Sequence, residues 1–270
     1  MDIYIARGEE RKGPYSGDSI RQFLADGLLD GTELAWHEGL AEWIALSQID
    51  GIVIQEVSRA QPPLHVPTQV VLNSPEAKSA IEAAIRMAAE KPTGELTEAD
   101  LEKVEKLNLS NNKISDVSAL AGLTQLTDLH LGFNKISDVS GLKELKQLTN
   151  LELYSNQISD VSALKELTHL TGLNLSENKI DDVGPSKELK QLKSLDLGFN
   201  QISDVSALKE LKRLTNLNLR DNQIGDVSAL KALNQLIRLH LEDNPNLTKD
   251  QIAELQKALP RCRIEHNATK

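Results

Sequence analysis

Leucine and isoleucine recur along most of this chain in a fixed pattern of apolar and polar positions that repeats every 22 residues. Each unit contains the phrase LxxLxLxxN, as in the segment from Leu126 to Asn134. The alternating leucines have the period of a β-strand, so Leu129 and Leu131 should point inward while His130 and Gly132 point outward. The pattern predicts one short strand in every unit. The asparagines that end the phrase are Asn112, Asn134, Asn156, Asn178, Asn200, Asn222 and Asn244.

The return side of each unit is predicted to be a short 3₁₀ or irregular segment. Ile136, Val139 and Leu142 continue the apolar positions, with Ser and Asp between them. Ser and Asp side chains bond nearby backbone amides in turns and at helix starts. The asparagine amide carries both donors and acceptors, so it can bond the backbone of adjacent coils, which an aspartate cannot do fully. A repeat of this length indicates a solenoid of stacked coils that share one core.

The unit LxxLxxLxLxxNxIxDxxxL over residues 105–245 resembles the leucine-rich repeats of internalins and of a nuclear phosphatase-regulating protein. The resemblance implies an α/β solenoid that is right-handed, with a parallel sheet on its concave face and a helical N-terminal cap. It also implies that the protein recognises other proteins through that concave face.

Both ends of the repeats are predicted to be capped, over residues 74–104 and 246–270. Ser74 followed by Pro75 is a strong helix start, and Thr97 begins a second, shorter helix. At the other end Thr248 starts a helix, and residues 259–264 form a closing strand. Terminal repeats must cover the apolar ends of the stack, so we interpret both segments as structural.

Residues 1–50 lack the repeat and hold both tryptophans. Tyr4, the segment Gly13-Pro14-Tyr15-Ser16 and the stretch from Trp36 to Trp43 resemble the bacterial type of GYF domain, a small α+β fold. The resemblance implies an aromatic platform for a proline-rich peptide. The platform and its supporting residues would be Tyr4, Pro14, Tyr15 and Trp36.

Two departures from the GYF pattern bear on this platform. Ile3 stands where the family usually has tryptophan, and Gly27-Leu28-Leu29 stands where eukaryotic members have Gly-Tyr-Phe. The alternative is that the tryptophans only form the core of a small domain. Residues 51–73 carry three of the nine prolines and are predicted to be an extended linker.

Composition and charge exclude several classes of function. A net charge of −10 and a pI near 5.2 argue against nucleic-acid binding, which needs a basic surface. The single cysteine, Cys262, excludes an internal disulfide and should be buried and inert. We find no signal-like or membrane-spanning segment, so the expected location is cytoplasmic with no membrane partner.

We find no sequence motif for catalysis, a cofactor or a metal. The best constellation is Asp128, His130 and Glu152, which neighbouring strands would bring together. A solvated cross-strand pair is the preferred interpretation, and an acid–base or metal role is the alternative. The fourth repeat has Gly184-Pro185-Ser186 where its siblings have Ser-Ala-Leu, so a serine takes a core leucine position. We interpret this change as drift; a kink or second contact site is the alternative.

The outward positions of the strands are predicted to form three columns across the concave face. The first contains His130 and Glu152, the second contains Tyr154 and Arg220, and the third contains Phe133 and Phe199. Phe133, Tyr154 and Phe199, which are all the aromatic residues outside the first module, fall in these columns. Exposed aromatic and arginine side chains dominate the energetics of protein interfaces. The alternative is that the phenylalanines pack over the coil edge. The predicted partner-binding residues are Phe133, Tyr154, Phe199, His130, Glu152, Asp196, Arg220 and Arg238.

The function predicted from the sequence is that of a non-enzymatic adaptor with a GYF-like head and a leucine-rich repeat arm. The arm would bind a protein partner. A regulatory subunit that clamps an enzyme such as a phosphatase is the alternative. A surface adhesin of internalin type is a third possibility that the missing signal and anchor disfavour.

Overall fold

We analysed a computed structural model that describes residues 2–7, 10–16, 20, 34–37, 40, 44–46, 49 and 73–269. The chain divides into two compact units, residues 1–67 and residues 68–270. The predicted linker over residues 51–73 lies outside the described residues except for Asn73, and Trp43 and the Gly27-Leu28-Leu29 segment also lie outside them.

The N-terminal unit contains a four-stranded antiparallel sheet in the order β2-β1-β3-β4. Ile3 and Ile5 alternate with Tyr4 along β1 and are buried, so the strand turns its isoleucines to the core. Ile20 is helical and buried. The strands are β1 (Asp2–Arg7), β2 (Glu10–Ser16), β3 (Leu34–His37) and β4 (Ile44–Ala45).

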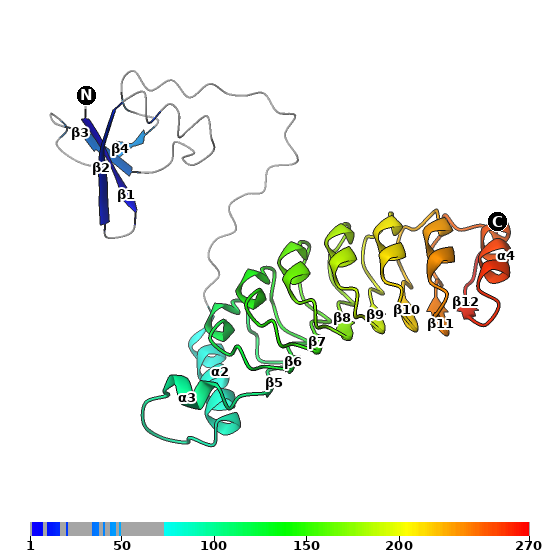
Figure 1. Ribbon diagram of the computed structural model, residues 1–270, viewed down its shortest axis with the longest axis horizontal. Coiled ribbons are helices and arrows are strands. Elements are labelled where there is room, and N and C mark those ends of the chain that lie inside the picture. The colour runs from blue at the N-terminus through cyan, green and yellow to red at the C-terminus, as the bar shows by residue number, and fades with distance from the viewer. Residues whose placement is uncertain are drawn as a thin grey trace. The chain divides into compact units, whose positions relative to one another are not determined.

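The second unit is a stack of coils joined by an eight-stranded parallel sheet. The sheet lies along one side of the stack, and the return segments lie along the other (Figure 1). Each repeat's strand pairs with the equivalent strand of the next, as Leu129 does with Leu151. The strands are β5 (Lys106–Asn108), β6 (Asp128–His130), β7 (Asn150–Glu152), β8 (Gly172–Asn174), β9 (Ser194–Asp196), β10 (Asn216–Asn218), β11 (Arg238–His240) and β12 (Arg263–Glu265).

The return segments are short 3₁₀ helices, as the sequence predicted. In the second repeat the Asp138 carboxylate accepts from the Ser140 amide at 2.7 Å, which holds the turn where the helix begins. The buried Ile, Val and Leu positions of each coil stack on those of its neighbours and form one continuous core. The helices are η2 (Ser118–Leu120), η3 (Ser140–Leu142), η4 (Ser162–Glu166), η5 (Gly184–Glu188), η6 (Ser206–Glu210) and η7 (Ser228–Ala232).

The asparagines form the predicted ladder between coils. The Asn178 Nδ2 donates to the carbonyls of Leu153 and Leu175 at 3.0 and 3.1 Å, and its Oδ1 accepts from the Ile158 amide at 3.0 Å. Asn134, Asn156, Asn200, Asn222 and Asn244 make the same three bonds in their own coils. One amide therefore satisfies backbone groups of two successive coils.

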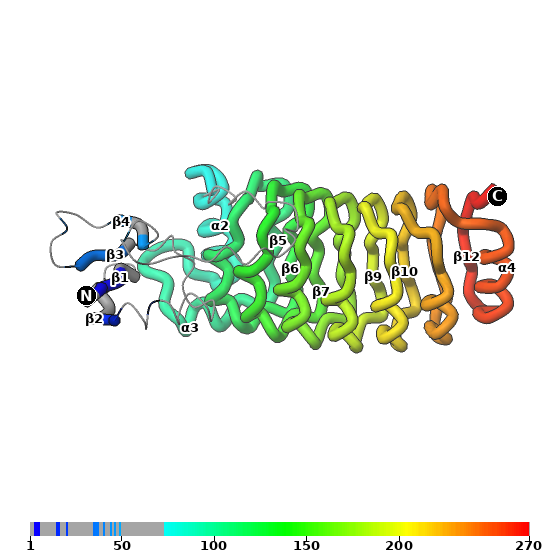
Figure 2. The backbone as a smooth tube through the Cα atoms, turned by 90° about the horizontal axis from the view of Figure 1, so that it is seen from above, coloured from blue at the N-terminus to red at the C-terminus, as the bar shows by residue number. Residues whose placement is uncertain are grey.

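Caps close the two ends of the stack, which Figure 2 shows from above. At the first end lie α2 (Pro75–Ala88), where the Ser74 hydroxyl accepts from the Ala77 amide, and α3 (Glu98–Leu101). The buried Asn73 bonds the Ser115 and Asp116 amides and so ties this cap to the first repeat. At the other end lie α4 (Lys249–Ala258), which begins after Thr248 as predicted, and the closing strand β12. This strand spans Arg263–Glu265, whereas the sequence predicted it over residues 259–264.

Ser186 occupies the core position that leucine holds in the sibling repeats. It is 3% exposed, and its amide donates to the Val183 carbonyl at 3.0 Å, as Leu164 and Leu208 do in their own coils. The Gly-Pro substitution before it therefore keeps the 3₁₀ turn of η5. Of the two interpretations, the kink finds no support in this backbone.

Candidate functional site

The predicted columns on the sheet side exist, but only the first lies within the strands. Strand pairing places His130 beside Glu152, and Asn174 beside Asp196. The strands end at this column, so the other two columns belong to the turn that follows. The third column is left-handed throughout, at Asn111, Phe133, Ser155, Glu177, Phe199, Asp221 and Asp243, with φ between 51° and 58°.

Phe133 and Tyr154 form an aromatic pair on this surface. Their ring centroids are 5.1 Å apart in an edge-to-face arrangement, and Phe133 is 57% exposed. Gly132 was predicted to face outward, yet it is buried, because the Tyr154 ring of the next coil lies over the place where a Cβ would be. The aromatic pair thus spans two adjacent coils, and the absence of a side chain at Gly132 makes room for the Tyr154 ring.

Phe199 repeats this arrangement three coils later with arginine in place of tyrosine. The Arg220 guanidinium lies 5.5 Å from the centre of the Phe199 ring, and its Nε is 3.1 Å from the Asp243 carboxylate. Phe199 follows a buried glycine, Gly198, as Phe133 follows Gly132. Three strand spacings separate the two phenylalanines, which is about 14 Å along the sheet.

The polar residues predicted to bind a partner differ in their contacts and exposure. His130 contacts Asp128 of its own strand at 3.0 Å, and Glu152 is its neighbour in register on the next strand, with no ion pair between His130 and Glu152 among the described contacts. Asp196 is engaged in the fold, since its carboxylate accepts from the Gly198 amide. Arg238 is exposed at the start of β11, beside Arg263 in register.

One cluster was missed by the sequence reasoning. His240, Glu242 and Glu265 present ligand atoms that all lie within 4.8 Å of one another. The signal was available: His240 and Glu242 have the spacing of one strand face, and Glu265 lies in the closing strand. What was missing is the register of that strand, because the atypical last repeat breaks the 22-residue count.

The structure places two of the four residues predicted for the peptide platform, Tyr4 and Trp36, side by side. Tyr4 and Trp36 are paired across β1 and β3, with ring centroids 6.1 Å apart and tilted by 47°. Trp36 also donates its indole N–H to the Leu40 carbonyl at 2.9 Å. Tyr15 packs against the buried core of the head. Ile3 is fully buried and belongs to that core. Pro14 lies on β2, and its side chain is outside the described residues.

Asp100 and Cys262, which lie outside the sheet surface, have clear pKa shifts. Hydrogen bonds from Lys91, and then from Thr97, hold the pKa of Asp100 far below the usual range of an aspartate. Burial raises the pKa of the Cys262 thiol, and this side chain is 4% exposed. The prediction that Cys262 is buried is confirmed, and a raised pKa disfavours the reactive thiolate.

This geometry, a stack of coils with one parallel sheet and an asparagine ladder, defines a leucine-rich repeat protein. Family models agree. The model for paired leucine-rich repeats matches residues 102–144, 124–166, 146–188 and 168–210, and a single-repeat model matches residues 213–231. The model described as GYF domain 2 matches residues 4–52. Both modules are protein-interaction modules. No curated protein matches the chain.

Solved structures show which leucine-rich repeat proteins this chain is similar to. An internalin C2 from Listeria monocytogenes is 30% identical, with a TM-score of 0.66 over 71% of this chain and 85% of that one. An internalin (inlF) from the same species is 28% identical, with a TM-score of 0.66 over 75% of this chain and 62% of that one. A leucine-rich repeat protein from Leptospira interrogans is 26% identical, with a TM-score of 0.52 over 62% and 50%.

The chain therefore belongs to the internalin-like leucine-rich repeat family and carries an N-terminal GYF domain. Within the described part of the chain, no helix has the length and apolar character needed to cross a membrane.

Proposed function

We propose that this protein is a non-enzymatic adaptor whose repeat arm binds a protein partner on the sheet side. The observation that carries the proposal is the pair of exposed phenylalanines, Phe133 at 57% and Phe199 at 43%, in a column that otherwise holds Asn, Ser, Glu and Asp. Aromatic and arginine side chains supply most of the binding energy in protein interfaces. Each phenylalanine is held against one such neighbour, Tyr154 or Arg220.

The backbone gives a second reason to assign these aromatics to binding. Both phenylalanines adopt a left-handed conformation, with φ of 54° and 56°. Asn and Asp adopt this conformation readily, as Asn111, Asp221 and Asp243 do in the same column, whereas a bulky residue does so at a cost. Phenylalanine is thus a poor choice for the turn and adds nothing to the core, which favours a role on the surface.

The charges around the aromatic positions suggest how a partner is oriented. Arg220 faces Asp243, and Glu152 and Asp196 lie in the neighbouring column without a lysine or arginine in register. The central part of the sheet is therefore acidic, and Arg220 and Arg238 add positive charge toward the C-terminal end. Such an asymmetric pattern favours one docking orientation and an on-rate that falls with salt.

A triple change to alanine at Phe133, Tyr154 and Phe199 tests the proposal. The variant should lose the partner in affinity capture from the native cell, while its melting temperature stays within about 3 °C, because exposed side chains contribute little to stability. Met87→Ala is the matched control: Met87 is 80% exposed on the cap helix α2, so its loss should affect neither property. Undiminished capture, or a large fall in melting temperature, refutes the proposed site.

The same capture separates the adaptor from an enzyme regulator. If the captured partner is an enzyme, its activity is measured with and without this protein, and a change in rate supports the regulatory alternative. Fractionation of the native cell separates both from an adhesin, which would be found at the surface.

We infer a second binding function for the head, a proline-rich peptide on the Tyr4 and Trp36 rings. The specific observation is that their ring centroids lie 6.1 Å apart on neighbouring strands, so the two rings form a continuous aromatic surface. Both tryptophans of the chain lie in the head, so fluorescence of the full protein reports on this module alone. Titration with a peptide of residues 58–70 should shift the emission, and a flat response at millimolar peptide rejects this ligand.

A further inference from the structure

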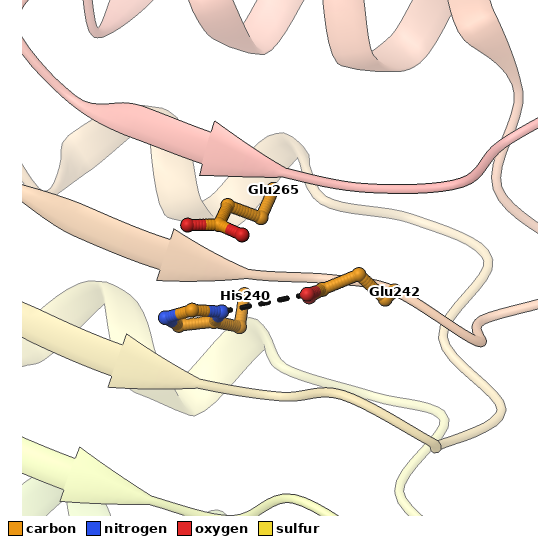
Figure 3. Close-up of side chains that lie close together, drawn as sticks. All are labelled: His240, Glu242 and Glu265. Carbon is orange, nitrogen blue, oxygen red and sulfur yellow. Dashed lines mark ion pairs between the residues drawn. The ribbon is translucent and has the colours of Figure 1, made fainter.

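Three side chains with metal-binding groups meet at the C-terminal end of the sheet. His240 and Glu265 are partners in register on the parallel strands β11 and β12, and Glu242 follows two residues after His240. Figure 3 shows the three on one side of these strands, with the Glu242 carboxylate directed at the imidazole. Their ligand atoms lie within 4.8 Å of one another, and the side chains are half-buried.

One atom in this cluster lacks a partner. The Oε2 atom of Glu242 is buried and accepts no hydrogen bond; in the described part of the chain it is the single buried side-chain oxygen or nitrogen atom in this condition. The other oxygen, Oε1, lies 3.5 Å from the Nδ1 atom of His240. A buried carboxylate oxygen without a donor is costly, because nothing replaces the water it has lost. A bound cation would provide the missing partner.

We propose that His240, Glu242 and Glu265 bind a divalent transition metal ion of the zinc class. One imidazole nitrogen and two carboxylate oxygens are ligands that zinc accepts, and the two negative charges balance the ion. Calcium and magnesium favour oxygen ligands alone, so the histidine argues against them. Three protein ligands leave at least one coordination position for water or for a side chain of a bound partner.

The distances are compatible with such an ion. Two ligand atoms that each lie about 2.1 Å from a tetrahedral metal are roughly 3.4 Å apart. The separation of 3.5 Å between His240 Nδ1 and Glu242 Oε1 already has this value. Glu265 must come slightly closer, which its long side chain allows by rotation, since it is 37% exposed.

Arg263 is the competitor for Glu265. Its Nε lies 3.1 Å from the Glu265 Oε1 atom. This arginine is 76% exposed, and exposed ion pairs of this kind contribute little. The second oxygen of Glu265 also remains available, so the arginine does not block the metal.

The experiment uses the full chain without a polyhistidine tag, because a tag would bind the same ions. Equilibrium dialysis against Zn²⁺ gives the stoichiometry, and Co²⁺ gives an absorption band that reports the geometry of the ligands. Glu242→Gln removes the charge and keeps the shape, and His240→Gln removes the nitrogen ligand. His169→Gln is the control, since His169 is an exposed histidine of another coil whose described contact is with the Lys146 carbonyl.

We expect one tightly bound zinc ion per chain and a visible cobalt band in the parent and in His169→Gln. Each of the two cluster variants should bind the metal at least tenfold more weakly and lose the cobalt band, while its circular dichroism is unchanged. Glu265→Gln provides an independent variant on the edge strand. Absence of binding at millimolar zinc overturns the proposal. So does equal binding by the parent and the cluster variants.

Discussion

Asn178→Asp tests the asparagine ladder with the smallest possible change in shape. The amide of Asn178 is 9% exposed and donates to the carbonyls of Leu153, Leu175 and Ser176. The Ser176 carbonyl also accepts from the Ser155 amide, so it keeps a partner. The Leu153 carbonyl also accepts from the Asn156 side chain, and the Leu175 carbonyl also accepts from the Asn200 side chain, so each keeps one donor. The aspartate would therefore remove the second donor from both carbonyls, and would set a buried carboxylate against their oxygens.

The magnitude follows from these contacts. Each of the two lost hydrogen bonds costs about 1 kcal/mol, the buried carboxylate facing carbonyl oxygens adds about 1–2 kcal/mol, and the bond from the Ile158 amide recovers about 1 kcal/mol because it becomes charge-assisted. We expect a net loss of about 1–3 kcal/mol in the free energy of unfolding at neutral pH. Acidification should return part of it, because a protonated carboxyl can again donate to one carbonyl.

Urea denaturation at pH 7 and pH 5, followed by circular dichroism, measures both effects. The matched control is Asn112→Asp at the first position of the ladder, which is half-buried and for which only a bond to the Ser110 carbonyl is described. That variant should lose much less, within about 1 kcal/mol of the parent. If the two variants are equally stable, or if Asn178→Asp changes nothing, the ladder does not stabilise the stack as argued.

Two further changes address the core and the cap. Ser186→Leu should raise the free energy of unfolding by about 1–3 kcal/mol, because a buried leucine restores the apolar contacts of the sibling repeats. Thermal denaturation of the variant and the parent tests this. A lower melting temperature of the variant would mean that the core of the fourth coil has no room for a leucine. Asp100→Asn should be less stable than the parent at neutral pH, because Asp100 accepts from Lys91 and Thr97 and its pKa is lowered. Because the pKa of Asp100 is lowered in the folded chain, its carboxylate stabilises the fold fully above the ordinary aspartate pKa of about 3.9, and this stabilisation is progressively lost below that pH. The difference in the free energy of unfolding between the parent and Asp100→Asn should therefore shrink as the pH falls from about 5 to about 2 in urea titrations. A constant difference over this range would contradict the carboxylate's role.

The repeat architecture was predictable because its determinants are local and repeated. A leucine at a given phase meets the equivalent leucine of the next coil, so Leu129 and Leu151 pair without any long-range information. The same holds for the Asp-x-Ser turns and for the ladder, since a period of 22 residues places each asparagine beside the backbone of the coil before it. Helix starts at Ser74 and Thr248 were equally readable from capping chemistry.

The contents of the surface depended on tertiary structure. The sequence by itself determined the fold class, the core phases and the column in which each outward residue lies, because these follow from a period alone. Only the folded chain decided that Tyr154 covers Gly132, that Arg220 turns to Phe199, and that His130 contacts Asp128 in its own strand. Side-chain direction depends on rotamers and on left-handed turns, which no periodicity specifies. The cluster of His240, Glu242 and Glu265 lay beyond prediction for a related reason: the closing strand abandons the repeat, and only its pairing with the last regular strand brings Glu265 beside His240.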